Sequence, residues 1–321
     1  MTLIGILLAL LAISAALALF SRRVAMKVEQ AIPPCGEFID VPGSRLHYVD
    51  HGVSSAEKPV IVMIHGLGAH LHHFKYALVD DLSRDTRVIA VDRPGSGYST
   101  RETGCATKLT DQADAIIALL DTLKIERALF VGHSLGGALS LTLALRHPTR
   151  VAGLALIAPL THYAGRFPEV FLALTVRGRV ARRFVAHVLA APGFILGRRR
   201  VMPKIFGPEP VPRDYRLRGG GLLTLRPSQY IGASEDLEAT PAVLPSLEAR
   251  YESLNRDDAP PIAMLYGRED AILDYRIHGE RFAERVPACR LELVSGGHML
   301  PLTQPERVAR FIRDALERRR V

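Results

Sequence analysis

The stretch that decides the fold is Ala128-Leu129-Phe130-Val131-Gly132-His133-Ser134-Leu135-Gly136-Gly137. It opens with an apolar run typical of a buried strand, and the apolar, helix-forming segment Leu135–Arg146 follows its serine directly. The glycines two positions before and after Ser134 suit a sharp strand-to-helix turn, because larger side chains would clash across it. Such a turn strains the backbone of the serine and points its hydroxyl outward. The pattern therefore predicts a nucleophile at Ser134 rather than a plain turn residue.

Short apolar runs rich in Val, Ile and Leu recur along the chain and alternate with helical stretches. Eight runs are predicted as strands: Glu37–Val41, Arg45–Asp50, Val60–Ile64, Arg87–Val91, Ala128–Val131, Gly153–Ile157, Ile262–Leu265 and Leu291–Val294. Near-continuous apolar strands between helices are typical of a mainly parallel sheet with helices on both faces. The first two runs instead alternate apolar and polar residues, so we expect an antiparallel hairpin at one edge. The predicted fold class is therefore α/β with an eight-stranded sheet.

Helices are predicted from apolar spacing and from the residues that start and stop a helix. Three are clear: Thr110–Leu123, Leu135–Arg146 and Pro305–Arg319. Thr110 or Asp111 is the candidate N-cap of the first helix. The second helix ends before Pro148, which cannot continue it. The third helix carries Arg residues in its last turn, where cations interact favourably with the helix dipole.

The alternation of strands and helices breaks between Pro159 and Pro260. This part is rich in Arg, Pro and Gly and has helical patches without a convincing buried strand, so we predict a helical cap inserted between the sixth and seventh strands. Four parts are expected: an N-terminal transmembrane anchor and linker at 1–28, the first part of the α/β core at 29–159, the cap at 160–258 and the second part of the core at 259–321.

The N-terminal segment Leu3–Phe20 holds 18 residues without a charge. As a helix it would reach about 27 Å, close to the hydrocarbon thickness of a bilayer. A signal peptide is the main alternative, with Ala16-Leu17-Ala18 as a candidate cleavage site, and a buried core helix is a third. Signal peptides begin with positive charge. Here Arg22, Arg23 and Lys27 follow the apolar segment, which favours an uncleaved anchor with the catalytic domain on the cytoplasmic side.

The formal net charge of +8 is concentrated in the predicted cap. Between Arg166 and Arg226 the sequence holds 13 Lys and Arg residues and three acidic ones. The basic residues are interleaved with apolar ones in helix-like patches, which argues against a nucleic-acid site. Such patches fit contact with a membrane surface or a lid over an apolar pocket. A solvated, Arg-rich face is the alternative.

Four further motifs support the serine turn. They are His65-Gly66-Leu67-Gly68, Asp92-Arg93-Pro94-Gly95-Ser96-Gly97-Tyr98-Ser99, Tyr266-Gly267-Arg268-Glu269-Asp270 and Gly296-Gly297-His298, and each follows a predicted strand. With these motifs the chain resembles the α/β-hydrolase superfamily, and within it the capped bacterial serine esterases and lipases. The resemblance covers almost all of Glu37–Leu316 except the cap. The order Ser, Asp, His along the chain is the order that this fold uses.

The resemblance implies a role for each motif. Ser134 would be the nucleophile, His298 the base that takes its proton, and Asp270 the acid that orients the imidazole. The backbone N–H groups of Leu67 and Leu135 would hold the oxyanion, an interaction worth about 3–4 kcal/mol per donor. No cofactor and no metal is expected.

Other polar residues near these motifs are further candidates. Glu269 and Asp274 are alternatives to Asp270 as the triad acid, while Asp92 is expected to brace its turn. His70, His72 and His73 fit no common zinc spacing. The three cysteines are far apart and form no recognisable disulfide framework: Cys35, Cys105 and Cys289.

The nucleophile limits the chemistry. Relatives that open epoxides or remove halides carry a carboxylate at the position of Ser134, so we expect cleavage of a carboxylic ester, thioester or amide, with esters favoured. The anchor and the apolar, basic cap suggest a small-molecule, lipid-like ester at a membrane surface. Hydrolysis of a carbon–carbon bond and haloperoxidase-like activity use the same residues and remain open. A non-catalytic, membrane-tethered binding protein is the alternative from another class.

Overall fold

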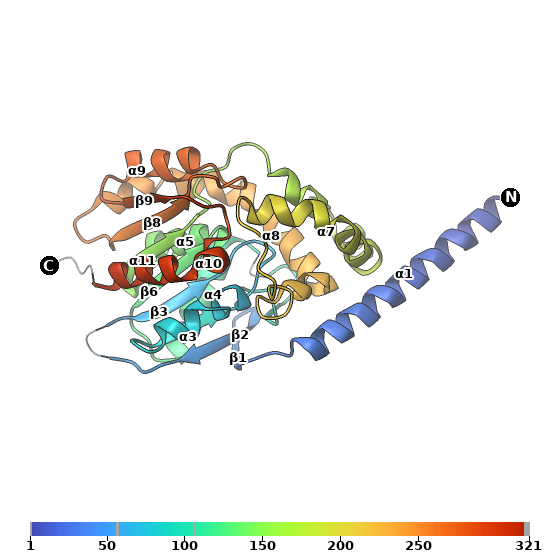
Figure 1. Cartoon of the computed structure of the whole chain (residues 1–321), viewed down its shortest axis with the longest axis horizontal. Helices are drawn as coiled ribbons and strands as arrows, with labels where there is room; N and C mark the ends of the chain where they lie inside the picture. Colours follow the sequence, from blue (N-terminus) through green and yellow to red (C-terminus); the bar gives the residue numbers. More distant parts are fainter. Residues whose placement is uncertain (1, 56–57, 106, 318–321) are drawn as a thin grey trace.

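The computed structural model describes residues 2–55, 58–105 and 107–317. Its centre is one mixed sheet with the strand order β1-β2-β4-β3-β6-β7-β8-β9 (Figure 1). The strands are β1 (Glu37–Val41), β2 (Ser44–His51), β3 (Val60–Ile64), β4 (Val88–Val91), β5 (Thr100–Arg101), β6 (Ala128–His133), β7 (Val151–Ile157), β8 (Ile262–Gly267) and β9 (Arg290–Val294). In this spatial order, all neighbouring strands from β4 through β3, β6, β7 and β8 to β9 are parallel. The pairs β1–β2 and β2–β4 are antiparallel.

The predicted α/β fold with a mainly parallel sheet is confirmed. All eight predicted strands are present, and their bounds differ from the prediction by two residues at most. The count of eight was one too low, because the two-residue strand β5 also pairs with β2. A strand this short has no alternation of apolar and polar residues from which it could be recognised.

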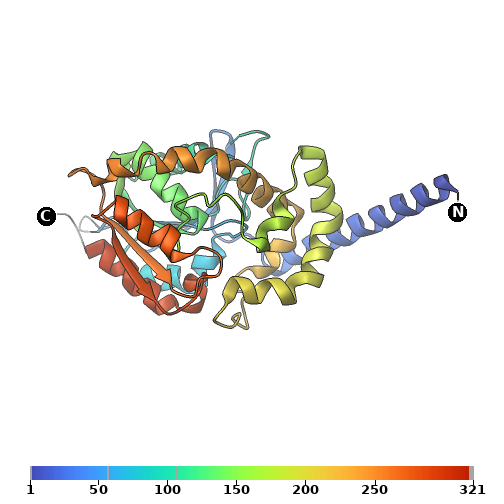
Figure 2. The same cartoon turned by 90° about the horizontal axis from the view of Figure 1, so that it is seen from above.

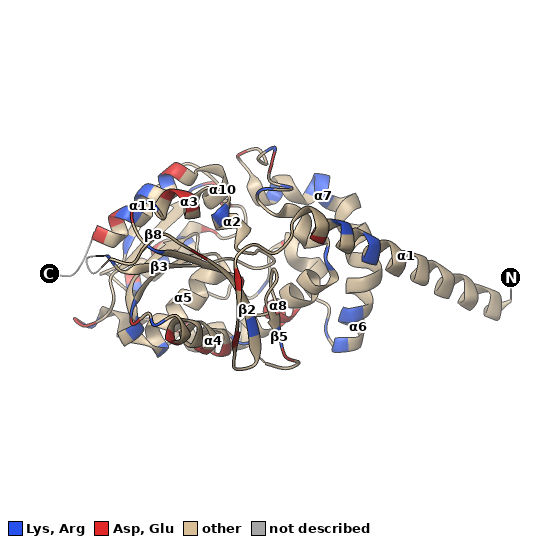
Figure 3. Ribbon diagram, turned by 90° about the horizontal axis from the view of Figure 1, so that it is seen from below, with Lys and Arg blue, Asp and Glu red and all other residues tan. Residues whose placement is uncertain are grey.

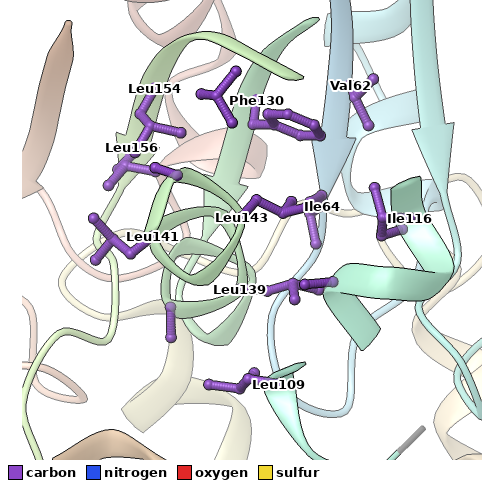
Figure 4. Packing of buried hydrophobic residues seen from close by; sticks show 14 of the residues in the cluster. Val62, Ile64, Leu109, Ile116, Phe130, Leu139, Leu141, Leu143, Leu154 and Leu156 are labelled. Carbon is purple, nitrogen blue, oxygen red and sulfur yellow. The ribbon is translucent and has the colours of Figure 1, made fainter. Parts of the chain in front are cut away.

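Helices cover both faces of the sheet. On one face, α4 (Leu109–Thr122) and α5 (Leu135–Arg146) pack on the strands, and Figure 4 shows Leu139, Leu141 and Leu143 of α5 among the strand residues. The other face is covered by α2 (His72–Lys75), α3 (Leu78–Leu82), α10 (Leu300–Thr303) and α11 (Pro305–Glu317). Helix α5 is buried almost all round, which explains why its sequence is apolar without a polar stripe.

One predicted detail of the helices differs from the structure, and another concerns residues that the structure does not describe. Helix α4 begins at Leu109 with Lys108 as its N-cap and without a side-chain cap bond, so the predicted cap at Thr110 or Asp111 was wrong. Instead, the Thr110 hydroxyl donates to the Asp111 carboxylate within the first turn. The predicted arginines at the end of α11, from position 318 onward, lie outside the described residues.

Between β7 and β8 the chain forms helices and 3-10 or π turns. These are η2 (Glu169–Leu174), α6 (Arg179–Phe184), η3 (Val185–Ala190), α7 (Ala191–Phe206), η4 (Gly221–Leu225), α8 (Pro227–Glu248) and η5 (Tyr251–Asn255). Figure 2 shows α6, η3 and α7 as a long, bent arm beyond the carboxyl ends of the parallel strands. Helix α8 returns the chain to the core, where Val243, Leu244 and Leu247 join the main apolar cluster.

The N-terminal helix α1 (Leu3–Ala31) runs without a break through the predicted linker. Its first part projects away from the rest of the molecule, and its last turns lie beside the arm of α7 (Figures 1 and 2). There Val24 and Val28 share an apolar cluster with Phe194 and Ile195 of α7. An ion pair of 2.9 Å between Glu29 and Arg226 adds to this contact. The end of α1 is therefore packed against the arm.

Candidate active site

Ser134 lies at the turn between β6 and α5 with φ 54° and ψ −119°, which is strained for a residue with a side chain. The surrounding glycines permit this turn. A Cβ atom at Gly136 would lie 2.0 Å from the carbonyl oxygen of Ile64, and one at Gly132 would lie 2.5 Å from that of Gly136. Because both contacts are with backbone atoms, neither position accepts a side chain. The steric reason given for the glycines from the sequence is thus confirmed.

Asp270 and His298 come together at the ends of β8 and β9. The Asp270 Oδ2 and the His298 Nδ1 are 2.7 Å apart, and both side chains are buried. The second oxygen, Oδ1, accepts the backbone N–H groups of Ile272 at 2.8 Å and Leu273 at 2.9 Å. An ionised carboxylate only accepts hydrogen bonds, so Nδ1 of His298 carries the proton and Nε2 is left as the basic nitrogen.

Ser134 lies between two cavities of the described residues. His298 lines the first cavity with Ser134, and Asp270 lines the second with Ser134. The residue before the serine also holds the histidine, because the ring of His133 donates from Nε2 to the carbonyl oxygen of His298 at 2.9 Å. The structure therefore brings the three predicted triad residues to the same edge of the sheet, at the carboxyl ends of β6, β8 and β9.

Leu67 and Leu135 lie beside Ser134, and both line the cavity that contains Asp270. Across the part of the chain that the structure describes, neither backbone N–H donates to another protein atom. Two free N–H groups beside a serine hydroxyl are what an oxyanion site requires. The loop of Leu67 packs directly on Ser134, since a Cβ atom at Gly66 would lie 2.9 Å from the Cβ of Ser134.

Arg93 holds this loop in place, a role that the sequence analysis missed. Its guanidinium is fully buried and donates to the carbonyl oxygens of His65 at 3.0 Å and Gly66 at 3.1 Å. It also pairs at 2.7 Å with the buried Asp236 of α8. One arginine thus connects the loop beside Ser134 to the returning cap helix. The sequence places Arg93 in a turn motif, but nothing in that motif points to a partner 143 residues away.

The two cavities differ in character. The first has a volume of about 380 Å³ and is mostly apolar. About a third of its lining residues come from the bent arm: Val185, Leu189, Ala190, Gly193, Phe194, Gly197, Val201, Met202 and Ile205. The second has a volume of about 310 Å³ and mixes apolar side chains with His162, His278 and Asp274. Ser134 therefore has an apolar chamber on one side and a partly polar chamber on the other.

The other candidate acids form hydrogen bonds with loop residues and not with the ring of His298. Asp92 accepts from the backbone N–H groups of Leu71 and Tyr98 and lies 2.7 Å from the ring of His47, so it braces its turn as expected. Burial, the largest single effect, would raise the pKa of Asp92, but the hydrogen bonds and charges of its neighbours, His47 first among them, together lower the pKa. Glu269 accepts the backbone N–H of Gly296 at 2.6 Å. Asp274 accepts from Arg276 within its own turn.

Four of the buried histidines around the site are expected to make the protein sensitive to acid. Burial lowers the pKa of His65 to about 4 and that of His73 to about 3, and it lowers the pKa of His70 and His133 well below the usual value. The unfolded chain, with ordinary histidine pKa values near 6.5, binds more protons than the folded chain below that pH. We expect the free energy of unfolding to be fully present above about pH 6.5 and to fall by several kcal/mol as the pH drops toward 4.

Urea midpoints of the purified protein at pH 7, 6, 5 and 4.5 measure this effect. A midpoint that stays constant from pH 7 to 4.5 would contradict the assignment of these four rings as neutral.

Comparisons with known proteins agree with this geometry. A family model described as the alpha/beta hydrolase fold matches residues 59–305. The chain is 26% identical over 266 residues to an Agrobacterium fabrum protein provisionally named a carbamate hydrolase, covering 81% of this chain and 94% of that one. It is 37% identical over 134 residues to the 2-hydroxymuconate semialdehyde hydrolase of Pseudomonas sp. strain CF600, covering 41% and 46%. The solved enol-lactonase of Burkholderia xenovorans LB400 has a TM-score of 0.71 and 23% identity, covering 88% of this chain and 100% of that one.

Proposed function

Since the chain belongs to the α/β-hydrolase fold family, we propose that it is a serine hydrolase that cleaves a carboxylic ester through an acyl-serine intermediate. The observation that carries the proposal is the hydrogen bond between Asp270 and His298 at the edge of the sheet where Ser134 is exposed to two cavities. Hydrolysis of p-nitrophenyl esters of increasing acyl length tests it, with the Ser134→Ala variant as the blank. Absence of turnover with every ester would contradict it.

The mechanism follows from the position of the proton on His298, which lies on Nδ1 and leaves Nε2 as the base. Its Nε2 takes the proton of the Ser134 hydroxyl as the oxygen attacks the ester carbonyl, and the imidazolium that forms is stabilised by Asp270. The N–H groups of Leu67 and Leu135 stabilise the negative oxygen of the tetrahedral intermediate. His298 then gives its proton to the leaving alcohol, and water removes the acyl group by the same steps in reverse order.

The apolar chamber suggests a lipid-like acyl group. Its lining from η3 and α7 is almost wholly hydrocarbon, so a chain buried there gains about 0.8 kcal/mol per CH₂ group. A short acyl group would leave the chamber partly empty. We expect turnover to rise with acyl length in the p-nitrophenyl series until the chamber is full.

The chain is proposed to act at a membrane. Helix α1 is long and apolar enough to cross a bilayer, and the most apolar part of it is not buried against the rest of the described chain. The cap adds a surface beside it: Val180 and Leu196 are 84% and 83% exposed, and the residues around them include Arg179, Arg183 and Arg198. Figure 3 shows the Lys and Arg residues on α6 and α7, next to α1. Apolar and basic groups together suit a surface of anionic lipid.

Because α1 is packed on the arm of the cap, the anchor would hold the apolar chamber near the bilayer. The basic residues that follow the apolar segment place the domain on the cytoplasmic side in this proposal. An intact-mass measurement of the mature protein distinguishes an anchor from a signal peptide, since cleavage after Ala18 would remove the anchor.

Deleting Leu3–Phe20 should separate the contribution of the anchor at a lipid surface from the ester hydrolysis itself. This deletion keeps Val24 and Val28, which pack on the cap. We expect turnover of a soluble short-chain ester to stay within about twofold, and turnover of an ester embedded in anionic vesicles to fall at least about tenfold. The reason is that the anchor raises the effective concentration of enzyme at the lipid surface. The measurement compares both rates for the full and the shortened chain, and equal loss of both would contradict the proposal.

One comparison favours a second candidate reaction, the hydrolysis of a carbon–carbon bond. The relative from Pseudomonas sp. strain CF600 is named for hydrolysis of 2-hydroxymuconate semialdehyde, and it matches 134 residues at 37% identity. A carbon–carbon bond hydrolase would use the same three side chains. Turnover of a ring-fission product at a higher kcat/KM than any ester of the panel would favour this alternative.

A further inference from the structure

The partly polar chamber contains two buried histidines that the proposed mechanism does not use. His162 lies shortly after β7, and His278 lies in η6 (Arg276–Glu280), which follows the loop of Asp270. They are only 1% and 4% exposed, and their ring centroids are 6.3 Å apart. Both rings line the cavity that Ser134 and Asp270 also line. Whatever occupies this chamber during attack by Ser134 therefore meets the two rings.

The hydrogen bonds of His162 leave one nitrogen as a free acceptor. The Thr161 hydroxyl donates to the carbonyl oxygen of His278 at 2.8 Å, so its oxygen can only accept from Nδ1 of His162 at 2.7 Å. Nδ1 thus carries the proton of the neutral ring, and Nε2 has only its lone pair. Among the described residues this buried Nε2 has no partner. Burial lowers the pKa of His162 to about 4, so the ring stays neutral at physiological pH.

His278 has the opposite tautomer. The backbone N–H groups of Thr161 and His162 donate to its Nδ1 at 3.3 and 3.4 Å, so Nδ1 is an acceptor and Nε2 carries the proton. Burial lowers the pKa of this ring as well, to about 4. No acceptor for its Nε2–H is found within the described ranges. Each ring thus leaves one nitrogen for a ligand, an acceptor on His162 and a donor on His278, and the other polar residues that line this chamber include Arg166, Thr240 and Asp274.

We propose that His162 and His278 bind a hydroxyl group on the alcohol part of the ester, which makes esters of diols or polyols the preferred substrates. This assignment rests on the proposed ester hydrolysis. A hydroxyl group is both donor and acceptor, and it matches the two nitrogens. A carboxylate could pair with Arg166 of the same chamber, but it only accepts hydrogen bonds and would leave the lone pair of His162 unmatched. A hydrocarbon alcohol would leave both nitrogens buried without a partner, which costs binding energy.

The two chambers suggest how the ester is oriented at Ser134. The chamber on the side of His298 is lined mostly by hydrocarbon, whereas His162 and His278 line the chamber on the side of Asp270. An ester placed across Ser134 therefore has its acyl chain in the first chamber and its alcohol in the second. In this orientation both histidines act as specificity residues for the leaving group.

The experiment uses the full chain and three esters of one acyl group: the 2-hydroxyethyl, the 2-methoxyethyl and the propyl ester. The methoxy group accepts a hydrogen bond but donates none, and the propyl group does neither. All rates are divided by the rate of the same variant with the p-nitrophenyl ester, so that a general loss of activity cancels. Wild type should prefer the hydroxyethyl over the methoxyethyl ester about tenfold in kcat/KM, the discrimination expected for one hydrogen bond to a buried acceptor.

Two variants test the roles of the two rings separately. His162→Phe should bring the preference for hydroxyethyl over methoxyethyl close to one. His278→Phe should lower the relative kcat/KM of both oxygen-containing esters toward that of the propyl ester. His187→Phe is the matched control, because His187 is exposed and lines neither chamber, and it should keep the wild-type preferences.

An unchanged preference in His162→Phe, or no preference in wild type, overturns the assignment of the histidines. Failure of the proposed function looks different, since wild type would then not hydrolyse the p-nitrophenyl ester either.

Discussion

Replacing Ser134 with alanine is expected to lower kcat/KM for a p-nitrophenyl ester roughly 10⁵-fold. The change removes the proposed nucleophile, while the proposed oxyanion donors Leu67 and Leu135 and the two chambers stay in place. Loss of a nucleophile in a serine triad has effects of this size, and the activity that remains comes from binding and oxyanion stabilisation. The measurement is the steady-state rate of ester hydrolysis by purified protein.

Ser140→Ala is the matched control for this substitution. Ser140 is a buried serine in α5, the helix that begins directly after Ser134, and its hydroxyl donates to the carbonyl oxygen of Gly136 within that helix. We expect this variant to keep its activity within about threefold. Retention of activity by Ser134→Ala would assign the reaction to another group.

Asp270→Asn is expected to lower kcat about 10⁴-fold. The Oδ1 atom accepts two backbone N–H groups, so the amide oxygen of the variant would keep this position. The amide NH₂ would then face Nδ1 of His298 and donate to it. The proton of the ring would move to Nε2, and His298 could no longer accept the proton of Ser134.

The neighbouring carboxylates serve as comparisons for Asp270. Asp274→Asn should change kcat less than about threefold, because this carboxylate interacts with Arg276 and not with His298. Glu269→Gln should have an intermediate effect, since Glu269 supports the backbone of Gly296 two residues before the histidine. A larger loss in Asp274→Asn than in Asp270→Asn would reverse the assignment of the acid.

The sheet could be predicted from the sequence because its strands are short apolar runs between clear turn residues. Val60–Ile64 is apolar throughout and was predicted with its true bounds, whereas the two-residue β5 has no pattern to recognise. The site followed from topology, since parallel strands end at the same edge. The residues after β6, β8 and β9 therefore had to lie near one another.

The contacts of the cap could not be predicted in this way, because they join residues that are distant in sequence and that no motif pairs. Arg93 pairs with Asp236, and Glu29 with Arg226, across 143 and 197 residues. The opposite tautomers of His162 and His278 depend on Thr161 and on the path of the backbone between β7 and η6. Sequence spacing gives no information about such hydrogen bonds.

The most direct test of the account is the site of reaction with a fluorophosphonate, which modifies a serine only when a base activates it. The labelled protein is digested, and the modified peptide is identified by mass spectrometry. We predict one adduct, on Ser134, and none in Ser134→Ala. Ester hydrolysis without an adduct on Ser134, or an adduct on a different serine, would contradict the central claim that Asp270 and His298 activate Ser134.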